Sequence, residues 1–101
     1  MTTKEIKEVL ADKLQSEGTY FQKSDIKVQK YGKGYKIVIK DYEHIEFIIK
    51  YENDDFGSLI TLWRKTPERK PAYLIHLEEG QNDNKLYDIL LNLGYYIGTR
   101  F

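Results

Sequence analysis

The hydrophobic residues change their spacing twice along this chain, and that change constrains the fold more than any other feature. Near the start they recur at helical spacing, at Ile6, Val9, Leu10 and Leu14. After Ser24 the spacing becomes two, as in a half-buried strand, and helical spacing returns near the end. The order of helix, strands and helix predicts an α+β layer fold, with one domain over residues 1–101.

The first helix has a clear beginning and end. Thr2 and Glu5 have the spacing of a capping box, in which each side chain accepts a backbone N–H of the other residue. Gly18 follows the last apolar position and favours a helix stop. The helix is therefore predicted over residues 3–17.

The middle of the chain predicts an antiparallel meander of five short strands. Glycines in the segment 32–34 allow a tight hairpin between the first two strands. Turn residues occupy 53–57, and a loop bracketed by prolines occupies 66–71. The strands are expected near residues 26–29, 35–40, 45–51, 58–64 and 72–77.

A second helix is predicted over residues 84–93, with Asp83 or Asn84 as its cap. Gly94 is expected to end it. The tail 95–101 then forms either a short final strand or an ordered arm. The predicted order is α-β-β-β-β-β-α.

Strand alternation assigns each side chain of the sheet to one of two faces. The face under the helices is expected to hold Ile26, Val28, Tyr35, Ile37, Ile39, Ile45, Phe47, Ile49, Tyr51, Leu59, Thr61, Trp63, Tyr73, Ile75 and Leu77. The opposite face then carries an apolar patch formed by Val38, Ile48, Ile60, Leu62 and Leu74. Such patches are rarely left bare, so we expect either the second helix or the tail to cover it, or a partner surface.

The charges are separated along the chain although sixteen basic and sixteen acidic residues cancel. Residues 23–40 hold six lysines against one acid, and positive charge returns at 64–70. Basic clusters steer encounters with charged partners, whereas lysines on edge strands also prevent aggregation. The residues expected to contact a partner are Lys27, Lys30, Tyr31, Lys33, Lys36, Arg64, Lys65, Arg69 and Lys70.

Residues suited to catalysis are scarce, because the chain has no cysteine and two histidines. No nucleophile elbow or phosphate-binding loop occurs in the sequence. The pairs His44/Glu46 and His76/Glu78 form two His-x-Glu tripeptides, which are weak candidates for metal ligands. We expect a non-enzymatic protein without a metal or cofactor.

The sequence predicts a cytoplasmic protein, since it lacks cysteine, an apolar signal segment and a span of about 20 apolar residues. Its bias toward Lys, Ile, Asn and Tyr is typical of a low-GC bacterium or its phage. The leading hypothesis is a small binding module, monomeric or a small homo-oligomer, that regulates or inhibits a protein partner. The alternative is a single-stranded DNA or RNA binder that uses the basic first hairpin.

Overall fold

The computed structural model describes residues 1–55 and 57–101, except for the side chains of residues 69–73. Its elements follow the predicted order, with one additional 3₁₀ turn after the first helix. They are α1 (Thr3–Ser16), η1 (Lys23–Asp25), β1 (Ile26–Tyr31), β2 (Gly34–Ile39), β3 (Glu46–Asp54), β4 (Gly57–Thr66), β5 (Arg69–Glu79) and α2 (Asp83–Arg100).

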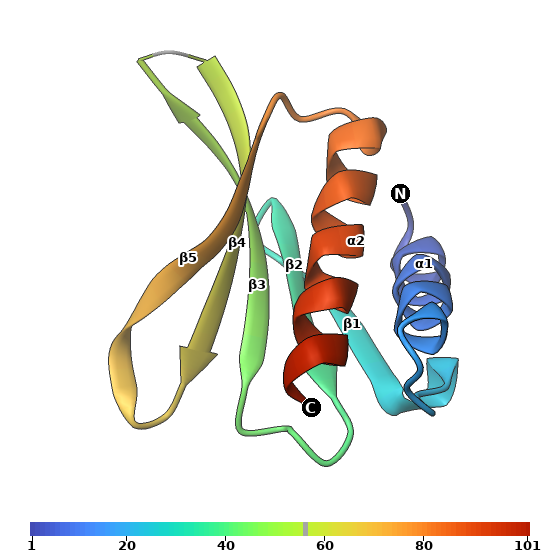
Figure 1. The fold of residues 1–101 in the computed structure, drawn as a ribbon. Coiled ribbons are helices and arrows are strands. Elements are labelled where there is room, and N and C mark those ends of the chain that lie inside the picture. Colours follow the sequence, from blue (N-terminus) through green and yellow to red (C-terminus); the bar gives the residue numbers. More distant parts are fainter. Residues whose placement is uncertain (56) are drawn as a thin grey trace.

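The five strands form one antiparallel sheet in the order β1-β2-β3-β4-β5. Both helices lie on the same side of this sheet, as Figure 1 shows. Helix α1 packs beside β1, α2 packs over β4 and β5, and the two helices pack against each other. The other face is left open by every element that the structure describes, so neither the second helix nor the tail covers it.

Helix α1 has the predicted caps. Thr2 Oγ1 accepts the Glu5 N–H at 3.1 Å, and Glu5 Oε1 accepts the Thr2 N–H at 3.2 Å. At the other end Gly18 has a φ of +89°, and the Thr19 N–H donates to the Leu14 carbonyl at 3.1 Å. This is a Schellman motif, in which a left-handed glycine ends the helix.

The core lies between the helices and the inner face of the sheet. Most residues that alternation assigned to that face in the first three strands are buried there. The central apolar side chains include Ile6, Leu10, Leu14, Ile37, Phe47, Ile49, Ile60, Leu62, Leu86, Ile89, Leu90, Leu93 and Ile97.

In β4 the prediction of faces is wrong. Ile49 pairs with Leu62 and Tyr51 pairs with Ile60, so Ile60 and Leu62 lie under the helices, fully buried. Thr61 and Trp63 therefore lie on the open face. The turn sets this register, because Asp54 pairs with Gly57 and the Gly57 N–H donates to Asp54 Oδ1 at 2.9 Å.

The assignment of Leu59 and Leu77 to the inner face is wrong for the same reason, because Leu59 lies two positions before Thr61 and Leu77 pairs with Thr61. Ile75 lies at a register shift of β5 and does pack against the core. The side chain of Tyr73 is outside the described part of the chain.

The second helix is longer than predicted, and the prediction of a final strand or arm is wrong. Helix α2 begins after Asn82, whose side chain accepts the Lys85 N–H at 3.0 Å, and continues to Arg100. Gly94 lies inside it and is buried against Lys13 of α1. A glycine that stops a helix and a glycine that admits a neighbouring helix look alike in a sequence.

Candidate functional site

The open face of the sheet carries a strip of apolar side chains from the four strands β2 to β5. Ile48 is 5% exposed, and Leu74 and Leu77 are 43% and 39% exposed. Cross-strand pairing places Trp63 between Ile48 and Leu74, and Thr61 beside Leu77. We call this set the open-face strip: Val38, Ile48, Leu59, Thr61, Trp63, Leu74 and Leu77.

Trp63 is held in place at the centre of the strip by hydrogen bonds. Its Nε1–H donates to Thr61 Oγ1 at 2.9 Å, and the Thr61 hydroxyl donates to Glu52 Oε2 at 3.1 Å. Thr61 is 2% exposed although it faces away from the helices, because its neighbours on the open face cover it. Lys50 Nζ lies 4.6 Å from the centre of the indole ring, so the ring is fixed from two sides.

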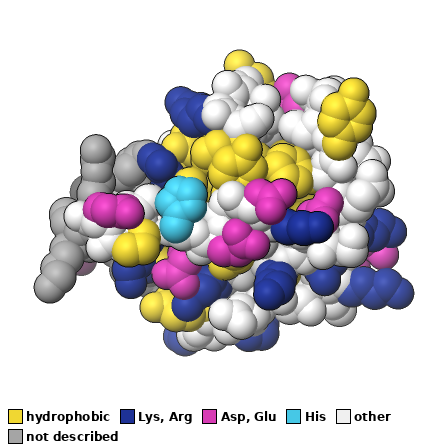
Figure 2. Space-filling model, turned by 90° about the horizontal axis from the view of Figure 1, so that it is seen from below, with side chains coloured by type: hydrophobic (Ala, Val, Ile, Leu, Met, Phe, Trp, Pro, Cys, Tyr) yellow, Lys and Arg dark blue, Asp and Glu magenta, His cyan; other side chains and the backbone are white. Residues whose placement is uncertain are grey.

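Charged side chains of both signs surround the strip. Lys36 Nζ pairs with Glu46 Oε2 at 3.1 Å and lies 4.6 Å from the Tyr31 ring centre. Figure 2, which looks at the end of the molecule where α2 stops, likewise shows hydrophobic side chains beside intermixed acidic and basic groups. This mixture differs from the uniformly basic surface that polyanion binders present.

The structure divides the predicted basic hairpin between the two faces of the sheet. Lys27, Tyr31 and Lys36 lie on the open face, whereas Lys30 is on the other face with its Nζ 4.5 Å from the Tyr35 ring centre. Lys33 is exposed in the turn between β1 and β2.

The second predicted basic segment is also divided. Lys65 is exposed on the open face, while Arg64 pairs with Phe47 on the helix side. The side chains of Arg69 and Lys70 are outside the described residues. Sequence position alone therefore does not define one basic surface.

Of the predicted apolar patch, the structure keeps Val38, Ile48 and Leu74 on the open face. It moves Ile60 and Leu62 into the core and adds Leu59, Trp63 and Leu77 in their place. Sequence reasoning missed Trp63 as a surface residue because both alternation phases of β4 are apolar. The signal that separates the phases is the pairing of Asp54 with Gly57, which fixes the register.

Strand alternation predicts both His-x-Glu pairs on the face away from the helices. The structure contradicts this for the pair His76/Glu78 and does not bring the two pairs together. His44 is exposed in the turn before β3, and Glu46 lies on the open face. His76 pairs with Leu62 and faces the helix side, where its Nε2 lies 3.3 Å from Glu78 Oε2. Within the described residues, no group of three acidic, histidine or cysteine side chains is close enough to hold a metal ion.

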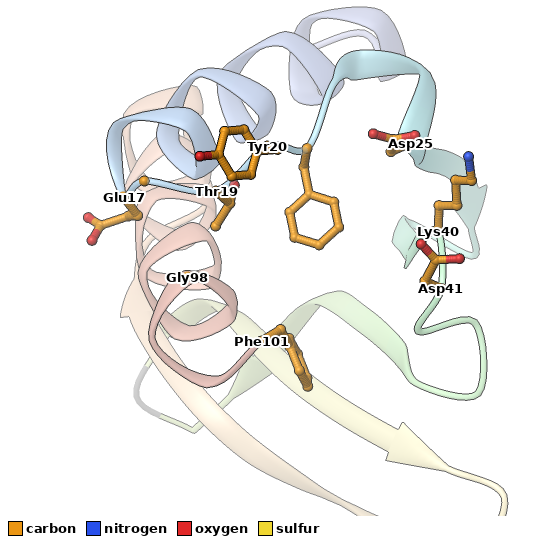
Figure 3. Close-up of a pocket in the computed structure, with 10 residues that line it drawn as sticks. Glu17, Thr19, Tyr20, Asp25, Lys40, Asp41, Gly98 and Phe101 are labelled. Carbon is orange, nitrogen blue, oxygen red and sulfur yellow. The ribbon is translucent and has the colours of Figure 1, made fainter.

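A pocket of about 510 Å³ opens at the ends of the two helices, as Figure 3 shows. Phe21 and Phe101 line it. Glu17 points away from the pocket and pairs with Lys13 at 2.7 Å, and Asp25 accepts the Gln22 N–H at 2.9 Å. Lys40 and Asp41 also line the pocket, which therefore combines aromatic surface with charged groups.

The turn beside this pocket has unusual backbone geometry. Asp41 has a φ of +73°, a left-handed conformation that aspartate tolerates better than most residues. Hydrogen bonds from the backbone N–H groups of Glu43 and Asp41 lower the pKa of the exposed Glu43 carboxyl. These groups shape the turn between β2 and β3 and lie outside the open-face strip.

None of the helices among the described residues is long and apolar enough to cross a membrane. Comparison with known proteins gives no relative: no family model, curated protein or solved structure matches the chain significantly.

Proposed function

We propose that this chain is a non-catalytic, cytoplasmic binding module that regulates or inhibits a protein partner through the open face of its sheet. The observation that supports this proposal is the open-face strip, an apolar surface with a fixed tryptophan at its centre and charges of both signs around it. Protein interfaces have this composition, with an apolar core, an aromatic anchor and a polar rim.

The fixed position of Trp63 favours binding. A side chain that already has one orientation loses little conformational entropy on binding, which favours affinity. The hydrogen bond to Thr61 and the contact with Lys50 hold the indole before any partner arrives. Trp63 is thus the residue that we propose as the anchor of the interface.

Single-stranded nucleic acid is the alternative partner, because Lys27, Lys36, Lys50 and Lys65 share the open face with two aromatic rings. Binding of this kind needs rings that are free to stack on bases. Here a lysine Nζ lies 4.6 Å from the centre of both the Tyr31 ring and the Trp63 ring. Glu46 also pairs with Lys36, so a protein partner is favoured.

The test is an affinity capture from bacterial lysate by the immobilised chain, with and without nuclease. We expect a discrete protein that survives nuclease, and a Leu74→Lys variant that binds it at least about tenfold more weakly, because a charge then interrupts the apolar strip. Tyr87→Lys is the matched control, since Tyr87 on α2 has the same 43% exposure as Leu74.

Two results would contradict the proposal. The first is equal loss of binding by the Leu74 and Tyr87 variants. The second is recovery of nucleic acid alone, with affinity that falls about a thousandfold between about 50 and 200 mM salt, as counterion release predicts for a protein with many phosphate contacts.

A further inference from the structure

Strand β5 is an edge of the sheet, and its described residues differ from those of the other edge. Strand β1 carries Lys27 and Lys30, which discourage pairing with another strand. The segment from Leu74 to Glu79 has no lysine and exposes Leu74 and Leu77. An edge of this kind is a template for a further strand.

The hydrogen-bonding pattern shows which residues of β5 face outward. The Gly80 N–H donates to the Ser58 carbonyl at 2.7 Å, so the Ser58–Gly80 pair is hydrogen-bonded. Such pairs alternate along an antiparallel ladder, so the Ile60–Glu78 pair is the next one. The Leu62–His76 pair follows it, so the main-chain groups of Leu77, which lies between Glu78 and His76, point away from β4 toward the free edge.

The side chains on either side of Leu77 are an imidazole and a carboxylate. His76 and Glu78 share the helix side of β5, with His76 Nε2 and Glu78 Oε2 3.3 Å apart. In an antiparallel pair of two β5 strands centred on Leu77, residues whose numbers sum to 154 lie opposite each other. His76 then faces Glu78 of the second copy, Glu78 faces its His76, and the two Leu77 side chains meet on the open face.

We propose that a second copy of this chain binds along β5, with the twofold axis at Leu77, so that two five-stranded sheets become one continuous sheet. The axis is perpendicular to the sheet, which keeps the helices of both copies on the same side. A pocket of about 380 Å³ beside His76 includes Arg100 in its lining, so a guanidinium group lies near the place of the incoming Glu78.

The test uses the full chain and measures its dimer dissociation constant by sedimentation equilibrium. We expect dimers, and we expect His76→Glu and Glu78→His each to weaken them about tenfold. The first variant sets carboxylates opposite each other, and the second removes the carboxylate from both cross-strand pairs. The double variant His76→Glu/Glu78→His again places a histidine opposite each carboxylate and should return the constant to within about threefold of the original.

The other His-x-Glu tripeptide provides the matched control. His44→Glu/Glu46→His exchanges the same residues next to and within the interior strand β3, and it should leave the dimer unchanged. Leu77→Lys places two lysines on the twofold axis and should give monomers. Because His76 and Glu78 are unchanged in this variant, it tests pairing along β5 independently of the His76–Glu78 contacts. Circular dichroism of each variant verifies that it is folded.

A chain that stays monomeric at about 1 mM would overturn the proposal, since a dissociation constant above that value corresponds to less than about 4 kcal/mol of binding. A dimer that is insensitive to both single exchanges and to Leu77→Lys would overturn it as well. The experiment uses the purified chain alone, so its result is independent of the partner proposed for the open face.

Discussion

Tyr51 is the residue whose ionisation most directly reports on the packing of the inner face. Its ring lies edge-on to Tyr35, with 6.4 Å between the ring centres. Burial of the hydroxyl, with smaller contributions from Tyr35 and Asp83, raises the pKa of Tyr51 from 10.0 to about 12. The folded chain therefore holds this proton more tightly than the unfolded chain does.

This shift predicts a loss of stability at high pH. The contribution of Tyr51 is complete below pH 10 and declines as pH rises toward 12, because between these values the unfolded state binds fewer protons than the folded state. Tyr51→Phe removes the ionisation, so its free energy of unfolding in urea should fall less between about pH 9 and 11.5 than that of the original chain. Parallel pH profiles for the two proteins would contradict the assignment.

Thr61 and Trp63 show why single residues of β4 were placed on the wrong face. Leu59, Thr61 and Trp63 form one alternating set, Ile60 and Leu62 the other, and both are apolar enough to be buried. The structure places the purely aliphatic set under the helices. The other set has a hydroxyl and an indole N–H that need hydrogen-bond partners. On the open face the Trp63 N–H donates to Thr61 Oγ1, and the Thr61 hydroxyl donates to Glu52.

At the scale of whole elements, the sequence predicted the type and order of both helices and all five strands. Strict periodicity and clear turn residues made these predictions possible, as for the glycine that ends α1. Element ends that depend on tertiary packing were not predictable. Gly94 stays inside α2 because α1 packs close to it, and the gain from that packing outweighs the poor helix propensity of glycine.

Gly94→Ala should therefore destabilise the fold although alanine is the better helix former. A β-carbon at this position would lie 2.9 Å from Lys13 Cβ and would also collide with Lys13 Cγ. We expect a net loss of about 1 kcal/mol, and at most about 2, in the free energy of unfolding, since overpacking costs about 1–3 and helix propensity returns about 1.

Urea denaturation measures this loss, and Asn92→Ala on the exposed side of α2 is the control. That substitution should change stability by less than about 0.5 kcal/mol. An unchanged or more stable Gly94 variant would mean that the two helices separate easily at this point.

At the scale of the whole molecule, the site was harder to predict than the fold because it depends on which face of the sheet the helices cover. The open-face strip exists because both helices cover the same side of the sheet, and nothing in either helix sequence specifies that choice. The predicted patch therefore contained residues of both faces. Val38, Ile48 and Leu74 were placed correctly, whereas the central residue Trp63 could be placed only from the register of β4.

One core connects the two helices with all five strands, and this arrangement predicts a single unfolding transition. Leu10→Ala in α1 leaves a cavity in that core and should lower the free energy of unfolding by about 2–5 kcal/mol. Trp63 lies on the far side of the sheet from this cavity, so its fluorescence tests whether the open face unfolds together with the helices.

We expect the transitions measured by Trp63 fluorescence and by far-ultraviolet circular dichroism to coincide in the original chain. Both should move to lower urea by the same amount in the Leu10 variant. Lys4→Ala, an exposed change in the same helix, should leave both in place. The prediction is contradicted if, in the Leu10 variant, the circular dichroism midpoint moves to lower urea while the Trp63 fluorescence midpoint does not. The open-face strip and its ion pairs would then keep the sheet folded without the helices.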